Sequence, residues 1–571
     1  MLTEAERQRI ISDDYADLLV DISRNPQISS LFPQGTLHVM NERNAIIYIP
    51  ASQLTGQIIS QYGYSVLPAV YGLTSQESLD ASEVNRLRRV PVFQLFGEGV
   101  LFGIIDTGID YTHPAFRNAD GTTRIQALWD QTIVSEQFPP DAMYGTVYFG
   151  NTINEALQGN NPLAVVPSVD ENGHGTALAG IAAGSVDDSN DFSGVIPNAE
   201  LVVVKLKPAK QNLKNFNFIP AEATAYQEND IMWGVRFVVE IARSLNRPIA
   251  ICIGLGSSMG SHDGQDALAN LLSLGGVFSG NVTVISSGNE GGARRHFFST
   301  ISANKGTVTV ELHVGENESG FTMELWGKAP NTYSIDILSP SGEYIPRIEE
   351  GLRVSRVIRF IFDRTVINID YEMIETSTGD QVIVMRIQNP TAGIWRFQVY
   401  TRGDLEGSFN IWLPMDGFIG DNTYFLQSDI YTTITSPGNA QIPITVTAYN
   451  PVTGNNLYQQ AGRGYTRTGK IKPDLAAPGV NIQCPSPGQG YTTYTGTGAA
   501  AAHTAGVTGI LLEWAIVRNN YPDINTIGTK KFLIRGARRS ENLTYPNRDW
   551  GYGILDIFNV FDLMRTSSQG I

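Results

Sequence analysis

The sequence predicts an α/β protein with a mostly parallel central sheet and helices on both faces of that sheet. Apolar stretches at 199–206 and 248–255 are typical of strands that are buried on both faces. A helical stretch at 230–245 separates them, and a strand, a helix and a strand in that order form the unit from which parallel sheets are built. Short alternating stretches between 303 and 428 predict a second, antiparallel architecture within the same chain.

The composition describes a folded chain with room for about two to four domains, at roughly 150 residues for each. The chain has 571 residues, of which 42% are hydrophobic and 17% are charged, and its formal net charge is −16. This acidic balance argues against nucleic acid or an anionic membrane as the main partner. Cys252 and Cys484 lie far apart, without the spacing of a metal site or a disulfide framework. We therefore expect no metal and no cofactor.

The first 23 residues lack the basic start and apolar run of a secretory signal. The chain also contains no uninterrupted apolar run of the length that a membrane-spanning helix needs. Both observations predict a protein without a signal peptide or a membrane span, made and kept inside a cell.

Residues 1–90 predict a small α+β unit. An extended segment, Ser65–Leu73, ends this unit and leads into a polar stretch at 74–83. Without further information the unit is an ordinary N-terminal domain. Its expected elements are a helix at 2–22, strands at 35–39 and 45–49, and a helix at 52–62.

A buried strand at 100–105 ends in Asp106-Thr107-Gly108. The carboxyl ends of parallel strands are where an α/β sheet places functional groups, and a carboxylate there can orient and support an imidazole. An isolated Asp-Thr-Gly is more often a turn or a helix cap, so this motif alone does not decide. Asp110 and His113 are predicted to be turn and loop residues.

His174 lies between two glycines at the start of a predicted helix, in Gly173-His174-Gly175. The flanking glycines leave the imidazole accessible. A lone histidine is usually structural, but that explanation fits poorly for one with these neighbours, downstream of Asp106.

Two further glycine turns follow predicted strands. Gly254-Leu255-Gly256 ends the strand at 248–255, and Ser287-Gly288-Asn289 follows an apolar strand at 282–286. Either turn can be an ordinary strand end, because Asn and Gly tolerate the left-handed backbone.

The stretch Thr497-Gly498-Ala499-Ala500-Ala501-Ala502-His503 runs from a glycine turn into a helix of small residues. A reactive group at such a helix start lies next to backbone amides that stabilise a developing oxyanion. Taken alone, small residues there more often mean close packing against a neighbouring helix.

Together these motifs resemble those of the subtilisin family, whose catalytic residues follow the order Asp, His, Ser. Asp106, His174 and the turn at 498 keep that order. The resemblance implies a subtilisin-like fold in which Asp106 supports His174 and the amide of Asn289 stabilises the tetrahedral intermediate. It also implies that the backbone of residues 254–256 forms one wall of the substrate cleft.

The same resemblance gives residues 1–90 the role of an inhibitory prodomain, whose extended tail lies along the cleft and is cut there. The implied partner is a peptide or protein substrate, or this tail itself. The family's serine position is occupied here by Gly498.

Residues 303–428 predict an antiparallel, jelly-roll-like β-sandwich inserted into the protease domain, which is thereby divided into 91–302 and 429–571. This arrangement, together with Gly260-Ser261-His262-Asp263-Gly264 and Leu511-Leu512-Glu513-Trp514, resembles the clostridial Csp germination proteases. That resemblance implies a cytoplasmic or spore-associated protein whose partner is a germination protease or the precursor of a cortex-lytic enzyme. Some members of that group have lost catalytic residues and act as regulatory pseudoproteases.

Gly498 has no side chain, so no acyl-enzyme can form there and His174 has no hydroxyl to deprotonate. Thr495, Thr497 and Ser486 are nearby hydroxyls, but a substitute must come within hydrogen-bond reach of the imidazole. Two interpretations remain open. The chain is a pseudoprotease that keeps its cleft for binding, or it is a serine endopeptidase whose nucleophile has been replaced.

Overall fold

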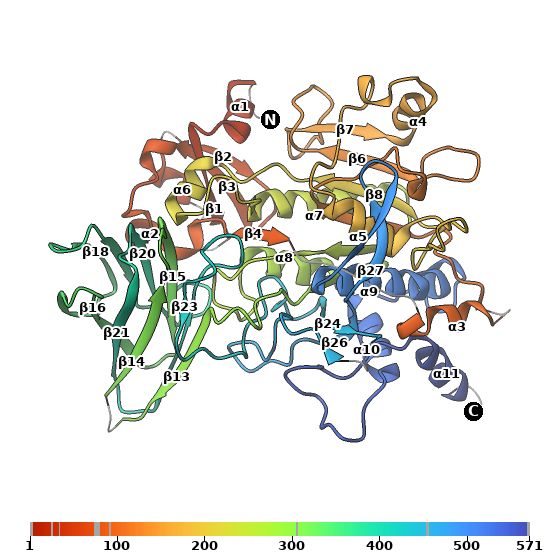
Figure 1. Cartoon of the computed structure of the whole chain (residues 1–571). Coiled ribbons are helices and arrows are strands. Elements are labelled where there is room, and N and C mark those ends of the chain that lie inside the picture. Colours follow the sequence, from red (N-terminus) through yellow and green to blue (C-terminus); the bar gives the residue numbers. More distant parts are fainter. Residues whose placement is uncertain are drawn as a thin grey trace.

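The computed structural model describes residues 4–23, 27–33, 35–73, 80–90, 93–303, 306–452 and 456–567. Within these ranges a central sheet has the strand order β25-β24-β12-β10-β5-β8-β6-β7, with β26 paired to β24 (Figure 1). Its strands are β5 (Leu101–Asp106), β6 (Ile125–Asp130), β7 (Thr146–Phe149), β8 (Glu200–Lys205), β10 (Ile249–Ile253), β12 (Asn281–Ser286), β24 (Ile444–Asn450), β25 (Asn456–Leu457) and β26 (Leu475–Pro478). Only β7 and β25 run antiparallel to their neighbours. The predicted mostly parallel α/β class is confirmed.

Helices cover both faces of this sheet, and each face has its own apolar core. On one face α5 (His174–Ala183) and α9 (Thr497–Leu512) pack against the strands, and on the other face lie α7 (Glu228–Ser244) and α8 (Ala267–Gly275). The remaining helices are α3 (Val84–Arg88), α4 (Gly150–Gln158), α6 (Gln211–Asn217), α10 (Thr526–Gly536) and α11 (Ile557–Ser567).

By length and composition, the helical stretch Thr497–Val517 is apolar enough to cross a membrane. In this fold 83% of its most apolar window is buried inside the protein, because α9 contributes small and aliphatic side chains to the central core. Figure 1 shows α9 behind the hairpin that β27 (Ile482–Ser486) forms with β28 (Gly490–Tyr494).

The N-terminal unit is a three-stranded antiparallel sheet with two short helices. It consists of α1 (Glu4–Ile11), β1 (Tyr15–Asp21), β2 (Thr36–Val39), β3 (Asn44–Pro50) and α2 (Ile58–Tyr62). The expected helix at 2–22 is wrong beyond Ile11. The apolar spacing suits a helix, but all seven residues of β1 pair with β3, and its centre is buried. The expected helix at 52–62 is α-helical only from Ile58.

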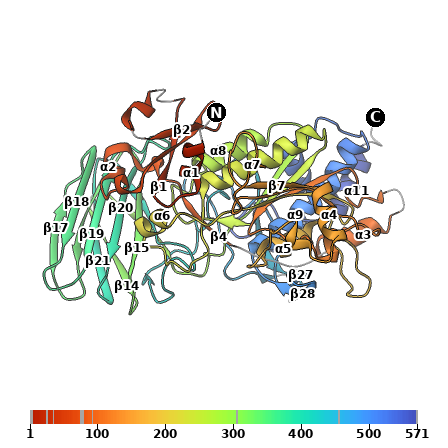
Figure 2. The same ribbon diagram turned by 90° about the horizontal axis from the view of Figure 1, so that it is seen from above.

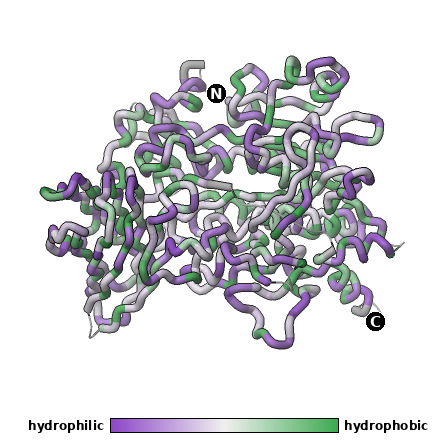
Figure 3. Tube along the Cα trace, viewed as in Figure 1, coloured by the Kyte–Doolittle hydropathy of each residue, from purple (hydrophilic) through white to green (hydrophobic). Residues whose placement is uncertain are grey.

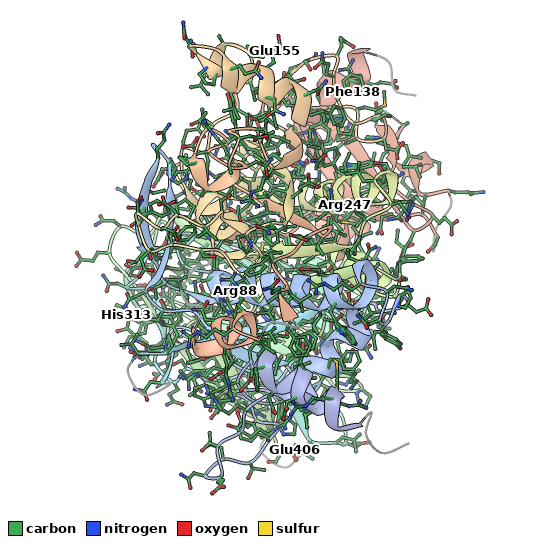
Figure 4. The ribbon with its side chains drawn as sticks, turned by 90° about the vertical axis from the view of Figure 1, so that its right-hand side faces the viewer. Arg88, Phe138, Glu155, Arg247, His313 and Glu406 are labelled. Carbon is green, nitrogen blue, oxygen red and sulfur yellow. The ribbon has the colours of Figure 1, made fainter. Side chains whose placement is uncertain are left out.

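The segment at 80–90 connects the N-terminal unit to the central core. The hydroxyl of Ser82 lies 2.5 Å from Nε2 of His503 on α9, and burial lowers the pKa of His503 to about 3, so this imidazole is neutral. The guanidinium of Arg88 donates to the carbonyls of Gly194 and Val195. Figure 4 labels Arg88 on α3, on the side of the molecule where this helix meets the C-terminal helices.

Two antiparallel sheets face each other between residues 296 and 425 and enclose a separate apolar core. One sheet contains β13 (His296–Ile301), β15 (Gly320–Gly327), β18 (Arg353–Arg359), β19 (Val366–Glu372), β20 (Gln381–Gln388) and β22 (Gly407–Trp412). The other contains β14 (Thr307–Val314), β16 (Thr332–Leu338), β17 (Tyr344–Ile348), β21 (Gly393–Arg402) and β23 (Tyr424–Phe425). The predicted inserted antiparallel sandwich is confirmed.

The N-terminal unit lies between α7 and the sandwich (Figure 2). One face of its sheet joins the core beneath α7, through Tyr48 among others. The other face forms a shared core with the sandwich, where Leu18 and Ile47 meet Trp326 and Val384. All three units therefore pack on one another through buried apolar surface.

Candidate active site

Asp106 and His174, which are 68 residues apart, meet at the carboxyl end of β5. Their side chains are almost fully buried, and Nδ1 of His174 lies 2.6 Å from Oδ1 of Asp106. The backbone N–H of Thr107 donates to the same oxygen at 2.7 Å. This arrangement fixes the orientation of the ring and assigns Nδ1 to the aspartate, so that in the mechanism of such a triad proton transfer falls to Nε2.

Glycines allow the backbone to approach this pair closely. A Cβ at position 175 would overlap the carbonyl oxygen of Gly108, and a Cβ at 254 would lie 3.3 Å from Cε1 of His174. Gly173, just before α5, has a φ of +84°, which L-residues rarely adopt. A side chain at 175 would push α5, and His174 with it, away from the Asp106 turn, and one at 254 would push that segment away from the imidazole.

Asp170 holds the Asp106 turn against the start of α5, and sequence reasoning missed it. Its carboxylate accepts hydrogen bonds from the hydroxyl of Thr107 at 2.8 Å and from the N–H of Gly173 at 2.9 Å. It also accepts both the N–H and the hydroxyl of Thr176. The only signal in the sequence was an aspartate four residues before His174, in a stretch typical of a turn.

Asn289 lies beside the N-terminus of α9. The N–H and the hydroxyl of Thr497 both donate to its Oδ1, each at 3.1 Å. Because a backbone N–H can only donate, the amide atom that faces it must be the oxygen. The amide NH₂ of Asn289 is then free to donate elsewhere, as an oxyanion donor must.

Gly498 is the second residue of α9 and is buried. The first N–H groups of this helix have no intrahelical acceptor, and they favour an anion at this end.

The neighbouring hydroxyls are engaged in other contacts. Thr497 donates to Asn289, and the hydroxyl of Thr495 accepts the N–H of Asn481. Ser486 lies in the β27–β28 hairpin. Tyr494, at the end of that hairpin, packs edge-on against the His174 ring with centroids 5.5 Å apart.

The extended tail of the N-terminal unit is inserted as a strand between two segments of the protease domain. β4 (Val70–Leu73) pairs antiparallel with β11 (Leu255–Gly256) on one side and with β9 (Tyr226–Gln227) on the other. Leu73 is opposite Leu255, and Leu255 follows Gly254, whose backbone lies close to the His174 ring. The polar stretch predicted at 74–83 lies partly outside the described residues, which resume at 80.

The sequence profile of the subtilase family matches residues 97–318 and 420–553, which together make up more than half of the chain. The chain belongs to the subtilase family. The gap between the two matched parts falls within the inserted sandwich, as expected for an insertion into a subtilase domain.

A search of solved structures finds that of the Clostridium perfringens CspB protease, with a TM-score of 0.75 and 32% identity, covering 85% of this chain and 98% of that one. The subtilase is therefore a subtilisin-like serine protease scaffold of the Csp type. Among curated relatives, the PII-type proteinase of Lacticaseibacillus paracasei is 22% identical over 98% of this chain and 32% of its own length. The minor extracellular protease Vpr of Bacillus subtilis is 22% identical over 83% of this chain and 53% of its own length. This chain thus spans about a third and about half of these two relatives.

In this subtilase a buried carboxylate supports the tail strand. Glu228, at the start of α7, accepts the N–H of Ala69 at 3.2 Å and that of Leu268 at 3.0 Å. The N–H of Glu228 donates back to the carbonyl of Ala69. Burial, followed by the nearby carboxylate of Asp266, raises the pKa of Glu228 to about 7.

Among the described ranges, no group of three His, Cys, Asp or Glu side chains could hold a metal ion. Cys252 and Cys484 are both buried and free. His113 caps a short 3₁₀ turn by accepting the N–H of Ala115, and its Nε2 lies 2.9 Å from the carbonyl of Gly490. Its contacts are thus those of the loop residue that the sequence predicted.

Proposed function

We propose that this chain is a Csp-type pseudoprotease, which binds an extended polypeptide in its cleft and does not cut it. The observation that carries the proposal is Gly498, which stands at the N-terminus of α9, where the family has its serine. Without a hydroxyl at this position there is no group for His174 to activate. In subtilisin itself, loss of the nucleophile lowers turnover by about 10⁶.

The binding half of the proposal rests on the cleft. β11 and β9 offer backbone hydrogen bonds to an added strand, and β4 occupies this position. Recognition of this kind depends on main-chain groups and pockets rather than on a nucleophile. An uncut N-terminal unit then acts as a prodomain that keeps the cleft filled.

A second candidate is a serine endopeptidase that processes a precursor protein and is present here with its nucleophile replaced. The intact contact between Asp106 and His174, and the orientation of Asn289, favour it. In either case the Csp resemblance suggests a cytoplasmic or spore-associated protein. The partner would be a germination protease or the precursor of a cortex-lytic enzyme.

The test is the intact mass of the purified chain beside that of a Gly498→Ser variant, each incubated alone. We expect the parent to remain whole. We expect the variant to be cut between residues 70 and 90, because β4 already pairs with β11 and β9 in the cleft.

Two control variants separate chemistry from folding. Gly498→Ala adds a Cβ without a hydroxyl, and Gly498→Ser with His174→Ala removes the base; both should stay whole. A parent chain that cuts itself would falsify the pseudoprotease proposal. If the serine variant also stays whole, the loss of activity extends beyond position 498 and the endopeptidase alternative is the weaker one.

A further inference from the structure

Strand β18 forms the outer edge of the sandwich. It pairs with β19 along its whole length, and no other strand of the described residues pairs with it. Figures 1 and 2 show it at the far left, at the end of the molecule away from the central sheet. An edge strand presents unpaired N–H and C=O groups to which a further strand can add. β18 contains no proline, so its outward N–H groups are all present.

Large apolar side chains are exposed along this edge. Leu352 and Val357 are 67% and 53% exposed, and Ile374, which follows β19, is 57% exposed. Ile361 and Phe362, in the turn after β18, are 84% and 81% exposed. Figure 3 shows hydrophobic segments among hydrophilic ones at this end of the sandwich. Of these residues only Val357 lies in β18 itself, and the others flank the two ends of the β18–β19 pair. Single exposed apolar residues are normal, but the adjacent pair Ile361 and Phe362 in one turn favours an interaction surface.

Three of the four arginines in β18 and the turn after it have no ion-pair partner among the described residues. Arg356, Arg359 and Arg364 are exposed and form no ion pair with the described residues, whereas Arg353 contacts Glu372 at 3.2 Å. This cluster stands out in a chain with a net charge of −16. Edges that only need protection from pairing typically carry lysine. Arginine is the cation enriched in protein interfaces, where lysine is depleted.

The exposed turn is held in one conformation. The carboxylate of Glu343 accepts the N–H groups of Ile361 and Phe362 at 2.9 Å and 3.0 Å. Next to them, the carboxylate of Asp363 accepts the hydroxyl of Ser341 at 2.7 Å. The two apolar side chains are therefore presented to solvent by a structured turn, which lowers the entropy lost when a partner covers them.

In the antiparallel register centred on Arg356, a second copy of this chain would bring like charges together. If two β18 strands paired antiparallel about Arg356, the two Arg356 side chains would face each other and Arg353 would face Arg359. Like charges directly opposite each other destabilise a strand pair. Carboxylates opposite these arginines would instead stabilise it.

We propose that the β18 edge, with the turn at Ile361 and Phe362, is a docking surface for an acidic, partly apolar segment of a partner protein. The segment adds to the sandwich as a further strand. Its main chain bonds to β18, and its carboxylates pair with Arg359 on one face of the sheet and with Arg356 on the other. Its apolar residues cover the turn. This surface is separate from the cleft, so the protein can hold the partner while the cleft remains filled.

The test uses the full chain and a short fluorescent peptide of Val in which two Glu residues stand three positions apart, matching Arg356 and Arg359, with binding followed by anisotropy. We expect saturable binding that weakens as salt is added. A variant with Arg356→Glu and Arg359→Glu should bind about tenfold more weakly, a loss of about 1.4 kcal/mol. A variant with Ile361→Ser and Phe362→Ser should also bind more weakly. None of these side chains is buried, so we expect the thermal unfolding of both variants to match that of the parent.

The matched control carries Lys328→Glu and Lys531→Glu, which make the same change in net charge at exposed positions away from this edge. It should bind like the parent, and a peptide with Lys in place of Glu should not bind. Equal peptide binding by the β18 variant and the control would overturn the proposal. So would two other results: binding of the parent to vesicles containing anionic lipid but not to the peptide, or dimerisation that Arg356→Glu abolishes.

Discussion

Close packing and hydrogen bonds limit which residue types can occupy the positions around His174, even where the residue takes no part in catalysis. Gly175 must lack a side chain because the turn at Gly108 lies against it. Asp170 must be correctly placed because its carboxylate accepts hydrogen bonds from both sides of the site. Neither residue is one of the family's three catalytic residues, yet both determine where His174 lies.

Gly175→Ala should destabilise the fold by about 1–3 kcal/mol, because the added methyl group overlaps a backbone oxygen that cannot move freely. Chemical denaturation measures this change. The control is Gly275→Ala at the end of α8, where nothing lies within 4 Å of the new Cβ. That substitution should leave stability unchanged or raise it by up to about 1 kcal/mol. Equal effects at the two positions would contradict the close packing described at Gly175.

Asp170→Asn should cost about 1–3 kcal/mol of stability. The NH₂ group of asparagine cannot accept the hydrogen bonds that Thr176 donates to the carboxylate, so a buried donor loses its acceptor. Urea denaturation measures the loss. Asp120→Asn, in an exposed turn, should change stability by less than about 0.5 kcal/mol. An Asp170 variant as stable as the parent would show that these hydrogen bonds contribute little.

At the scale of single elements, β4 is the part of the N-terminal unit that reaches the cleft. It is short, and its position depends on pairing with β9 and β11 and on the burial of Tyr71, which is fully inaccessible to solvent. Glu228 secures the residue before it. One buried aromatic side chain therefore carries much of the attachment of this strand.

Tyr71→Ser should increase hydrogen exchange at the backbone amides of Val70–Leu73 by at least about tenfold. Full burial of an aromatic side chain contributes roughly 2–3 kcal/mol, and its loss favours local opening of the strand. Exchange in β5 should change much less. Tyr344→Ser, at a position that is 54% exposed, is the control. Unchanged protection of β4 in the Tyr71 variant would show that the backbone pairing alone holds the strand.

On the scale of the whole molecule, a stack of rings joins the protease domain to the sandwich. The ring of His262 lies parallel to that of Trp412, with centroids 4.0 Å apart, and His296 packs on the same indole at 4.9 Å. The two nitrogens of His262 contact the carbonyls of Ile434 and Ser258. Burial lowers the pKa of His262 to about 4, from an ordinary value of 6.5.

This shift predicts that acid weakens the protein. Between pH 6.5 and pH 4 the unfolded chain binds a proton at residue 262 that the folded protein does not bind. The stabilisation is therefore complete above pH 6.5 and is lost as the pH falls towards 4, by an amount on the order of 3 kcal/mol. Thermal unfolding at a series of pH values should show a weaker pH dependence for His262→Gln than for the parent. His313→Gln, on β14, should keep the parent's dependence, and identical curves for parent and His262→Gln would contradict this assignment.

Sequence reasoning succeeded where a local pattern has one structural solution. Apolar stretches buried on both faces predicted β8 and β10, and a helix was correctly predicted to start at His174, although its imidazole is buried rather than accessible. It failed at 15–21, where the apolar spacing suits both a helix and a strand. There β3, more than 20 residues away, stabilises the strand because it provides a pairing partner for every residue of β1.

The sequence by itself determined the fold class, the family and the absence of a hydroxyl at position 498, because these depend on residue types and their order. Only the tertiary structure brought Asp106 within 2.6 Å of His174, turned the oxygen of Asn289 towards Thr497 and placed β4 between β9 and β11. It also placed the arginines of β18 on an open edge. The physical reason is that these contacts join residues far apart along the chain, and their distances follow from the packing of the sheet and helices rather than from any local preference.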